Sequence, residues 1–343
     1  MAKIYGDRWE IIRSLAEGGQ AHTFLVRDLK GDGEIHYVIK RLKNINRLER
    51  FKREIEAIRN LSHENIVRLI DFDLEAKEPY LVSEFCSGGS LSDAQSFWQN
   101  SPSKAFAIFH EVCEGVAYAH DHNIIHRDIK PDNIFLRTND GPAVVGDFGI
   151  CYVEDDGSRL TITEEAVGPR QFIAPELEDG RLDKISSKSD TYSLGKLLYW
   201  LFSGGKMFSR EKHRMLEWDL KGRNDDSALE WNNIYMEHVN RLLDLMIVNE
   251  PENRRSVRTI LRVSKKIAKL VEKEFSPISK DIPHPCKYCG YGIYKLQVKT
   301  IRNVSSFGLN LVGDPDWRIF TCDFCGHVQM FRVDLANKRE WWD

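Results

Sequence analysis

The residues most able to do chemistry are concentrated in one octet, 126–133, which reads His-Arg-Asp-Ile-Lys-Pro-Asp-Asn. The carboxylate of Asp128 could accept a proton from a substrate group. Lys130 adds a positive charge two residues later, and Asn133 adds a carboxamide that could act as a ligand. Apolar runs lie before and after the octet, so we interpret it as a polar loop supported by two buried segments.

Four of the seven cysteines form a second group near the end of the chain. They make two C-x-x-C pairs, each followed by a glycine that permits a tight turn: Cys286, Cys289, Cys322 and Cys325. An odd cysteine count without a secretion signal disfavours a disulfide framework and favours a metal site. Four thiolates leave no open coordination position, so the pattern predicts a structural Zn²⁺. The alternatives are redox pairs, idle thiols, or ligation by the adjoining His284 and His327.

Length and composition are those of an ordinary soluble protein with one large or two average domains. The 343 residues are 42% hydrophobic and 29% charged, and the net charge of −3 argues against a protein built to coat nucleic acid. The N-terminus has no apolar signal segment. The longest apolar-rich run, 194–202, is too short to span a bilayer and is interrupted by Gly195 and Lys196. We therefore predict a cytoplasmic protein without a membrane segment.

Hydrophobic periodicity predicts strands in the first part of the chain. These are expected at 9–15, 22–27 and 35–42, with further buried strands at 63–69 and 80–85. A turn of small residues, 16–21, joins the first two strands, and Lys40 lies near the end of the third. The same alternation predicts a hairpin from 134–136 and 143–145, directly after the octet.

Helical periodicity predicts three helices that support these strands and the octet. The first runs from about Arg47 to Leu61 and carries Glu54. The second, 101–122, leads into the octet, and the third is the last helix before the cysteine region. The third helix has Ile260, Val263, Ile267 and Leu270 at three- and four-residue spacing.

Further motifs stand in order after the octet. Asp147-Phe148-Gly149 lies fourteen residues beyond Asn133, and Ala174-Pro175-Glu176 closes a polar stretch that contains Ser158, Thr161 and Thr163. With the octet, these motifs resemble the protein kinases, whose catalytic loop reads H-R-D-x-K-x-x-N. The resemblance extends to 189–195 and 250–254 and covers roughly residues 9–272. It looks most like the bacterial kinases of eukaryotic type.

The resemblance implies an α+β, bilobal protein-kinase-like fold. An N-lobe, 9–84, would hold an antiparallel sheet with one helix, and a mostly helical C-lobe would span 87–272. In such kinases the residue matching Asp190 braces the catalytic-loop backbone, and Arg254 would pair with Glu176. A proline-containing linker, 273–285, would then lead to a small β zinc ribbon at 286–343.

The resemblance also implies an ATP site. Gly18 would lie in the loop that covers the phosphates, although Ala16 and Ala21 replace two of the family's glycines. Lys40 would hold the phosphates and Glu54 would orient Lys40. Backbone groups of the hinge, Glu84 to Cys86, would receive adenine, whereas the Cys86 side chain is interpreted as an ordinary buried thiol.

Catalytic roles follow from the same resemblance. Asp147 and Asn133 would hold Mg²⁺, Asp128 would accept the proton of the substrate hydroxyl, and Lys130 would steady the transferred phosphoryl group. A lysine two residues after Asp128 is typical of the serine/threonine class. Pro169 stands where kinases usually carry a threonine that bridges the catalytic aspartate and lysine, so the peptide preference stays open.

Two other functions remain as alternatives. A pseudokinase scaffold that binds nucleotide and acts through the ribbon would fit the eroded glycine loop, and a small-molecule kinase would fit a chain without the Ala174–Glu176 segment. From Pro283 onward, eight Lys/Arg face six Asp/Glu, and four thiolates with one Zn²⁺ bring the net charge to about zero. We therefore expect the ribbon to contact protein substrates or the kinase lobes, not nucleic acid. One copy phosphorylating another is a further expectation.

Overall fold

The structure is a computed structural model that divides into two compact units, Met1–Ala268 and Lys269–Asp343, which are described separately. The residues it describes are 3–17, 21–31, 34–99, 101–148, 152–153, 171–207, 233–273, 294–301, 317–322 and 324–332.

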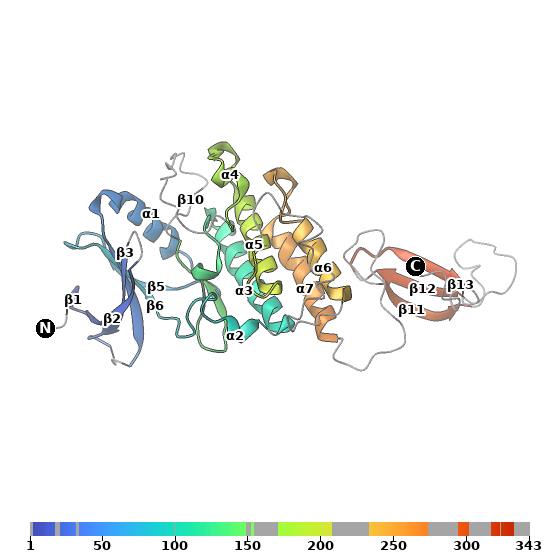
Figure 1. The fold of residues 1–343 in the computed structure, drawn as a ribbon, viewed down its shortest axis with the longest axis horizontal. Coiled ribbons are helices and arrows are strands. Elements are labelled where there is room, and N and C mark those ends of the chain that lie inside the picture. Colours follow the sequence, from blue (N-terminus) through green and yellow to red (C-terminus); the bar gives the residue numbers. More distant parts are fainter. Residues whose placement is uncertain are drawn as a thin grey trace. The chain divides into compact units, whose positions relative to one another are not determined.

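An antiparallel sheet forms the first part of unit one (Figure 1, blue). Within the described residues its order is β1-β2-β3-β4-β6-β5. The bounds are Ile4–Tyr5 (β1), Trp9–Glu17 (β2), Ala21–Asp28 (β3), His36–Leu42 (β4), Leu69–Asp73 (β5) and Tyr80–Glu84 (β6). Trp9, Val26, Ile39 and Val82 are completely buried in one cluster on this sheet. The three strands predicted between residues 9 and 42 are thereby confirmed.

The strand expected at 63–69 is displaced. β5 begins only at Leu69, and its residues are exposed or half-buried instead of buried. The reason is its place at the edge of the sheet, where none of the described strands pairs with its outer side. Residues preceding β5 instead connect to the C-terminal part of the unit, because Val67 N donates to Val145 O at 2.9 Å.

Helix α1, Leu48–Arg59, matches the predicted helix and packs on the sheet (Figure 1). A short 3-10 turn, Ile45–Arg47, precedes it, and the side chain of Asn44 caps this turn by accepting from Asn46 N at 3.0 Å. Phe51 and Ile55 are buried against the sheet. Glu54 lies beside them on the same face and is also buried.

The remainder of unit one is mainly helical. Its helices are α2 (Gln95–Trp98), α3 (Pro102–Asp121), α4 (Pro175–Glu178), α5 (Ser187–Phe202), α6 (Asn233–Asp244) and α7 (Val257–Lys273). Figure 1 shows α3 and α5 side by side, with the Phe106 and Phe202 rings 4.7 Å apart. Ser101 caps α3 and Ser186 forms a capping box with Ser189 at the start of α5. Among the helices described, none is both long and apolar enough to cross a membrane.

Short strands frame the octet. β7, Ile124–Ile125, precedes it and pairs with β10, Tyr152–Val153. A 3-10 turn, Pro131–Asn133, ends the octet, and β8, Ile134–Leu136, pairs with β9, Ala143–Val145, in the predicted hairpin. Because β7, β8 and β9 are mostly buried, the polar loop between them has a rigid support.

Unit two contains a three-stranded antiparallel sheet within its described residues, in the order β11-β12-β13. The strands are Tyr294–Ile301, Trp317–Cys322 and Val328–Arg332, in agreement with the β-rich character expected of this region.

Candidate active site

A buried carboxylate fixes the start of the octet. Both oxygens of Asp190 in α5 accept backbone hydrogen bonds, from His126 N and Arg127 N, each at 2.8 Å. The His120 ring lies 2.8 Å from the same carboxylate. Burial alone would raise the pKa of Asp190, but the hydrogen bond with His120 and the other donors outweigh it and leave this pKa lowered. Asp190 therefore braces the octet as an anion.

The His126 side chain connects the octet to the segment that carries Asp147. Its Nε2 donates to Gly146 O at 2.9 Å, and its Nδ1 accepts from Asp128 N at 3.2 Å. Its ring also lies 4.5 Å from that of Phe148, which is buried. Asp147 has a φ of +56°, a left-handed conformation that non-glycine residues adopt rarely and mainly where the surroundings enforce it.

Lys130 and Asn133 both donate hydrogen bonds to one carboxylate oxygen of Asp128. Lys130 Nζ donates to Asp128 Oδ2 at 2.7 Å, and Asn133 Nδ2 donates to the same oxygen at 2.9 Å. Asn133 Nδ2 also reaches Asp128 O at 2.7 Å. Within the described residues Oδ1 of Asp128 accepts no hydrogen bond, so it can receive a proton, while the Asn133 carboxamide oxygen is free to ligate a cation.

Lys40 joins two carboxylates from distant parts of the chain. Its Nζ lies 2.8 Å from Glu54 Oε1 in α1 and 2.7 Å from Asp147 Oδ1. Its positive charge lowers the pKa of Asp147 to about 2. Burial raises the pKa of Glu54, against the opposing charge of Lys40. Burial would lower the pKa of Lys40, but the charges of Asp147 and Glu54 raise it, so the lysine stays protonated at all physiological pH values.

The hinge presents backbone groups, because its side chains are already engaged. The Glu84 carboxylate accepts hydrogen bonds from the Arg137 side chain at 3.0 and 3.2 Å and from Arg68 N at 2.9 Å. Cys86 is 7% exposed, and burial raises the pKa of its thiol to about 12, which makes it unreactive. The Cys86 N–H meets no acceptor among the described residues and can donate to a ligand.

The Glu84–Arg137 clasp, defined by these two side chains, was not predicted from the sequence. Arg137 directly follows β8 and also donates to Glu64 O at 2.9 Å, so it ties the hinge to the C-lobe and to the loop before β5. His120 was missed as well. Its only signal was that it is a polar residue in the last turn of a helix that leads into the octet.

A buried ion pair anchors the Ala174–Glu176 segment, as expected. Arg254 donates to both oxygens of Glu176, at 2.6 and 2.7 Å, and both side chains are fully buried. Ser189 of α5 donates to Glu176 at 2.7 Å. The pair thus fixes α4 against the base of α5.

One of the two cysteine pairs is described, in unit two. Cys322 is buried at the end of β12, and its Sγ accepts from Phe324 N and Cys325 N, each at 3.4 Å. Gly326 has a φ of +74°, and its N–H donates to Cys322 O at 3.0 Å. Among the described residues, no group of three or more metal-ligating side chains gathers. Cys286 and Cys289 lie outside the described residues, as do Gly18, Ser158, Thr161, Thr163 and Pro169.

Comparison with known proteins identifies the family. The protein kinase domain family matches residues 9–264. The chain is 34% identical over 220 residues to the probable serine/threonine-protein kinase CE0033 of Corynebacterium efficiens, 62% of this chain and 33% of that protein. It is 29% identical over 284 residues to the kinase PrkC of Bacillus subtilis, covering 80% and 43%. With PknB of Mycolicibacterium smegmatis it shares 32% over 212 residues, covering 59% and 33%.

This chain therefore spans between a third and somewhat under half of the length of these curated relatives. The relatives are bacterial proteins named as serine/threonine kinases, and the matched region contains the octet, Lys40, Glu54 and Asp147. The resemblance inferred from the sequence is confirmed at the level of the family. The chain belongs to the protein kinase family.

Proposed function

We propose that this protein transfers the γ-phosphoryl group of ATP to serine or threonine hydroxyls of protein substrates. The observation that supports this most is the joint placement of Lys40, Glu54 and Asp147, because a cation for phosphates and an anion for a metal then stand side by side. The octet supplies the acid–base groups, through Asp128 beside Lys130 and Asn133. The names of the relatives support the serine/threonine class.

ATP would be held from two sides. Lys40 would bind its phosphates while Glu54 keeps the ammonium oriented, and Gly18 would cover them from the turn between β2 and β3. The N–H of Cys86 and the backbone of Glu84 would receive adenine at the hinge. Only backbone groups are needed there, since the Glu84 side chain is held by Arg137.

Mg²⁺ fits the oxygen donors of Asp147 and Asn133. Asp147 has a pKa of about 2 and is an anion at neutral pH, and within the described part of the chain the Asn133 carboxamide oxygen accepts no hydrogen bond while its nitrogen donates to Asp128. When bound, the ion neutralises charge on the phosphate oxygens. The residues that would hold it are Asp147 and Asn133.

The transfer itself is a displacement at phosphorus. The hydroxyl oxygen of the substrate forms a bond to the γ-phosphorus as the bond to the β–γ bridging oxygen breaks, which releases ADP. The hydroxyl proton passes to Asp128 Oδ1, because Oδ2 is held by Lys130 and Asn133. Lys130 steadies the transferred group by its charge.

We further propose that Cys286, Cys289, Cys322 and Cys325 bind one structural Zn²⁺, and that this ribbon recruits substrates or regulates the kinase unit. Two backbone N–H groups that donate to Cys322 Sγ support the proposal, since they stabilise a thiolate. The left-handed Gly326 closes the turn beneath the sulfur, and Cys286-Lys-Tyr-Cys289-Gly290 repeats this spacing.

The test is to incubate the full chain with labelled ATP and Mg²⁺ and to analyse the protein by mass spectrometry. We expect phosphate on serine or threonine, with sites among Ser158, Thr161 and Thr163 if copies phosphorylate each other. The Asp128→Asn protein is the control. Nucleotide binding without any transfer, to itself or to a panel of proteins, would instead favour the pseudokinase scaffold.

A further inference from the structure

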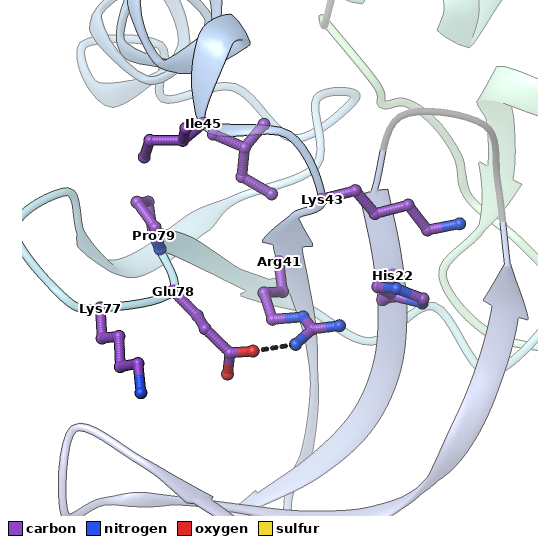
Figure 2. Close-up of a pocket in the computed structure, with 8 residues that line it drawn as sticks. His22, Arg41, Lys43, Ile45, Lys77, Glu78 and Pro79 are labelled. Atoms are coloured by element: carbon purple, nitrogen blue, oxygen red, sulfur yellow. Dashed lines mark hydrogen bonds and ion pairs between the residues drawn. The ribbon is translucent and has the colours of Figure 1, made fainter.

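A cavity of about 390 Å³ opens in the N-terminal part of unit one (Figure 2), and its lining includes neither Lys40 nor any residue of the octet. Its walls come from the start of β3, the end of β4 with the loop toward α1, and the loop between β5 and β6. Four basic residues line it: His22, Arg41, Lys43 and Lys77. Ile45 and Pro79 supply an apolar wall, and Glu78 is the acidic residue of the lining. We call this cavity the basic pocket.

Glu78 does not neutralise the basic pocket. Its Oε1 accepts from Arg41, and its Oε2 accepts from Lys3 at 2.5 Å and from the Tyr5 hydroxyl at 3.1 Å. The hydrogen bond from Lys3 lowers the pKa of Glu78, so it is an anion at neutral pH. Leaving Lys43 aside, Lys3, Arg41 and Lys77 are three permanent cations around the cavity against this one carboxylate. Both Glu78 oxygens are occupied by donors, and the surplus charge is positive.

Arg41 offers the best-placed donors. Figure 2 shows its guanidinium between Glu78 and His22, with one edge on the carboxylate. Its Nε is buried and has no acceptor among the described residues, which is costly unless a further ligand is present. The guanidinium carbon lies 6.0 Å from the centre of the Phe24 ring, so this aromatic face is close to the charged group.

Clustered surface lysines are ordinarily only a solvated face. Three features distinguish this cluster: a hollow in the surface, a carboxylate whose oxygens already accept from donors, and an arginine with an unmet buried donor among the described residues. A water takes about 30 Å³ of liquid, so the volume exceeds that of a small isolated anion. The apolar wall formed by Ile45 and Pro79 adds room for a carbon chain beside the anion.

We propose that the basic pocket binds a phosphate monoester carried by a protein segment, as on phosphoserine or phosphothreonine. Such a group carries nearly two negative charges and three acceptor oxygens at neutral pH, which matches the surplus charge and the arginine fork. The proposal rests on the proposed function, because phosphorylated segments are its products. The pocket would then recognise a segment that has already been phosphorylated.

The position of the pocket gives such binding a route to the nucleotide site. Arg41 follows Lys40 in β4, so the two side chains lie on opposite faces of the sheet. Ile45 belongs to the turn that leads into α1, which carries Glu54. A ligand in the basic pocket would therefore contact β4, which carries Lys40, and the turn that precedes the helix carrying Glu54.

The test measures binding without catalysis. Three probes are compared on the full chain by fluorescence anisotropy and competition: the peptide 155–165 phosphorylated at Thr161, the same peptide without phosphate, and inorganic phosphate. We expect the phosphopeptide to bind at least about tenfold more tightly than its unphosphorylated form. Using the Asp128→Asn protein as well separates this result from any failure of phosphoryl transfer.

The variants locate the binding site. Arg41→Gln should weaken phosphopeptide binding about tenfold or more. The Lys43→Gln, Lys77→Gln double variant leaves the Arg41–Glu78 pair intact and should also weaken phosphopeptide binding. It provides the measurement if Arg41→Gln impairs folding. Lys52→Gln, on the exposed side of α1, should leave binding unchanged. Three outcomes would overturn the proposal. They are equal affinity for the two peptides, inorganic phosphate that competes as well as the phosphopeptide does, and undiminished phosphopeptide binding in the double variant.

Discussion

Asp128 combines one fully engaged and one open carboxylate oxygen, and this asymmetry defines its expected role. Asp128→Asn keeps the shape but removes the proton acceptor, so phosphoryl transfer should fall by at least about 10²–10⁴-fold. Initial rates with labelled ATP measure this, and nucleotide affinity should stay unchanged. Asp132→Asn is the matched control, because Asp132 lies in the same loop and its carboxylate accepts a hydrogen bond from Ser92, away from Asp128. Near-normal turnover of the Asp128→Asn protein would remove Asp128 from catalysis.

The ionisation of Asp147 depends on Lys40, which sets a pH dependence. The folded pKa, about 2, is below the usual 3.8, so the ion pair stabilises the fold above pH 4 and is lost as the pH falls from 4 toward 2. Asp147→Asn should therefore lower the free energy of unfolding above pH 4. The difference between the two proteins should shrink as the pH falls from 4 toward 2. Because 46% of the Asp147 side chain is exposed, this difference should be only about 1 kcal/mol.

Urea denaturation of both proteins at pH 7, 4 and 3 provides the measurement. A difference in unfolding free energy that stays constant over these values would show that Asp147 titrates independently of Lys40.

At the scale of elements, the Glu84–Arg137 clasp joins the hinge after β6 to the end of β8. Arg137→Ala should release the hinge backbone and weaken ATP binding by about fivefold, or ~1 kcal/mol, while kcat changes less. Arg137→Lys should restore only part of the affinity, since it cannot form the bidentate pair. KM for ATP and direct nucleotide binding would measure the change.

Arg68→Ala is the control for this prediction, because Arg68 is 72% exposed and lies 4.0 Å from the same carboxylate. If both alanine variants had equal effects, simple loss of charge near Glu84 would explain them, and the clasp would have no special role.

The Glu176–Arg254 pair links α4 to the 3-10 turn before α7, with both side chains fully buried. Glu176→Gln leaves a buried guanidinium without its counter-charge, so the free energy of unfolding should fall by about 3–5 kcal/mol. Denaturant unfolding of unit one is the measurement. Glu252→Gln, at a carboxylate that is 66% exposed, should change stability by less than about 0.5 kcal/mol. A small effect of both substitutions would contradict the structural role of the pair.

At the scale of the whole molecule, the two units should respond differently to metal removal. Unit one has its own buried core, whereas unit two is small, and we expect its residues from 283 onward to need Zn²⁺ to fold. We expect one Zn²⁺ per chain by elemental analysis. Cys322→Ser or a chelator should expose residues 283–343 to proteolysis and leave nucleotide binding intact.

A chain ending at residue 275 is the matched control for that experiment, and it should still bind ATP. Absence of zinc, or a Cys322→Ser ribbon that stays resistant to proteolysis, would contradict the zinc proposal. Loss of ATP binding in the shortened chain would show that unit one depends on the residues removed.

The local sequence pattern was sufficient to predict many of the helices and strands of this protein. The strands between residues 9 and 42, the helix carrying Glu54, and the hairpin after the octet were all predictable, because period and turn residues act over a few neighbouring positions. The family followed from short motifs whose order is fixed by the chain. The exposed β5 was not predictable, since its burial depends on its place at the edge of the sheet.

Tertiary structure decided which of these residues meet. Lys40 and Asp147 are 107 residues apart, and the resemblance linked each of them to ATP, but the 2.7 Å contact depends on how β4 and the segment after β9 are brought together. Arg137 on Glu84 and the cavity around Arg41 had no sequence signal, and His120 beside Asp190 had only its polar type near the end of a helix that leads into the octet. The positions of these side chains depend on side-chain direction and on packing between distant elements, whereas hydrophobic periodicity in the sequence indicates only which face of one element is buried.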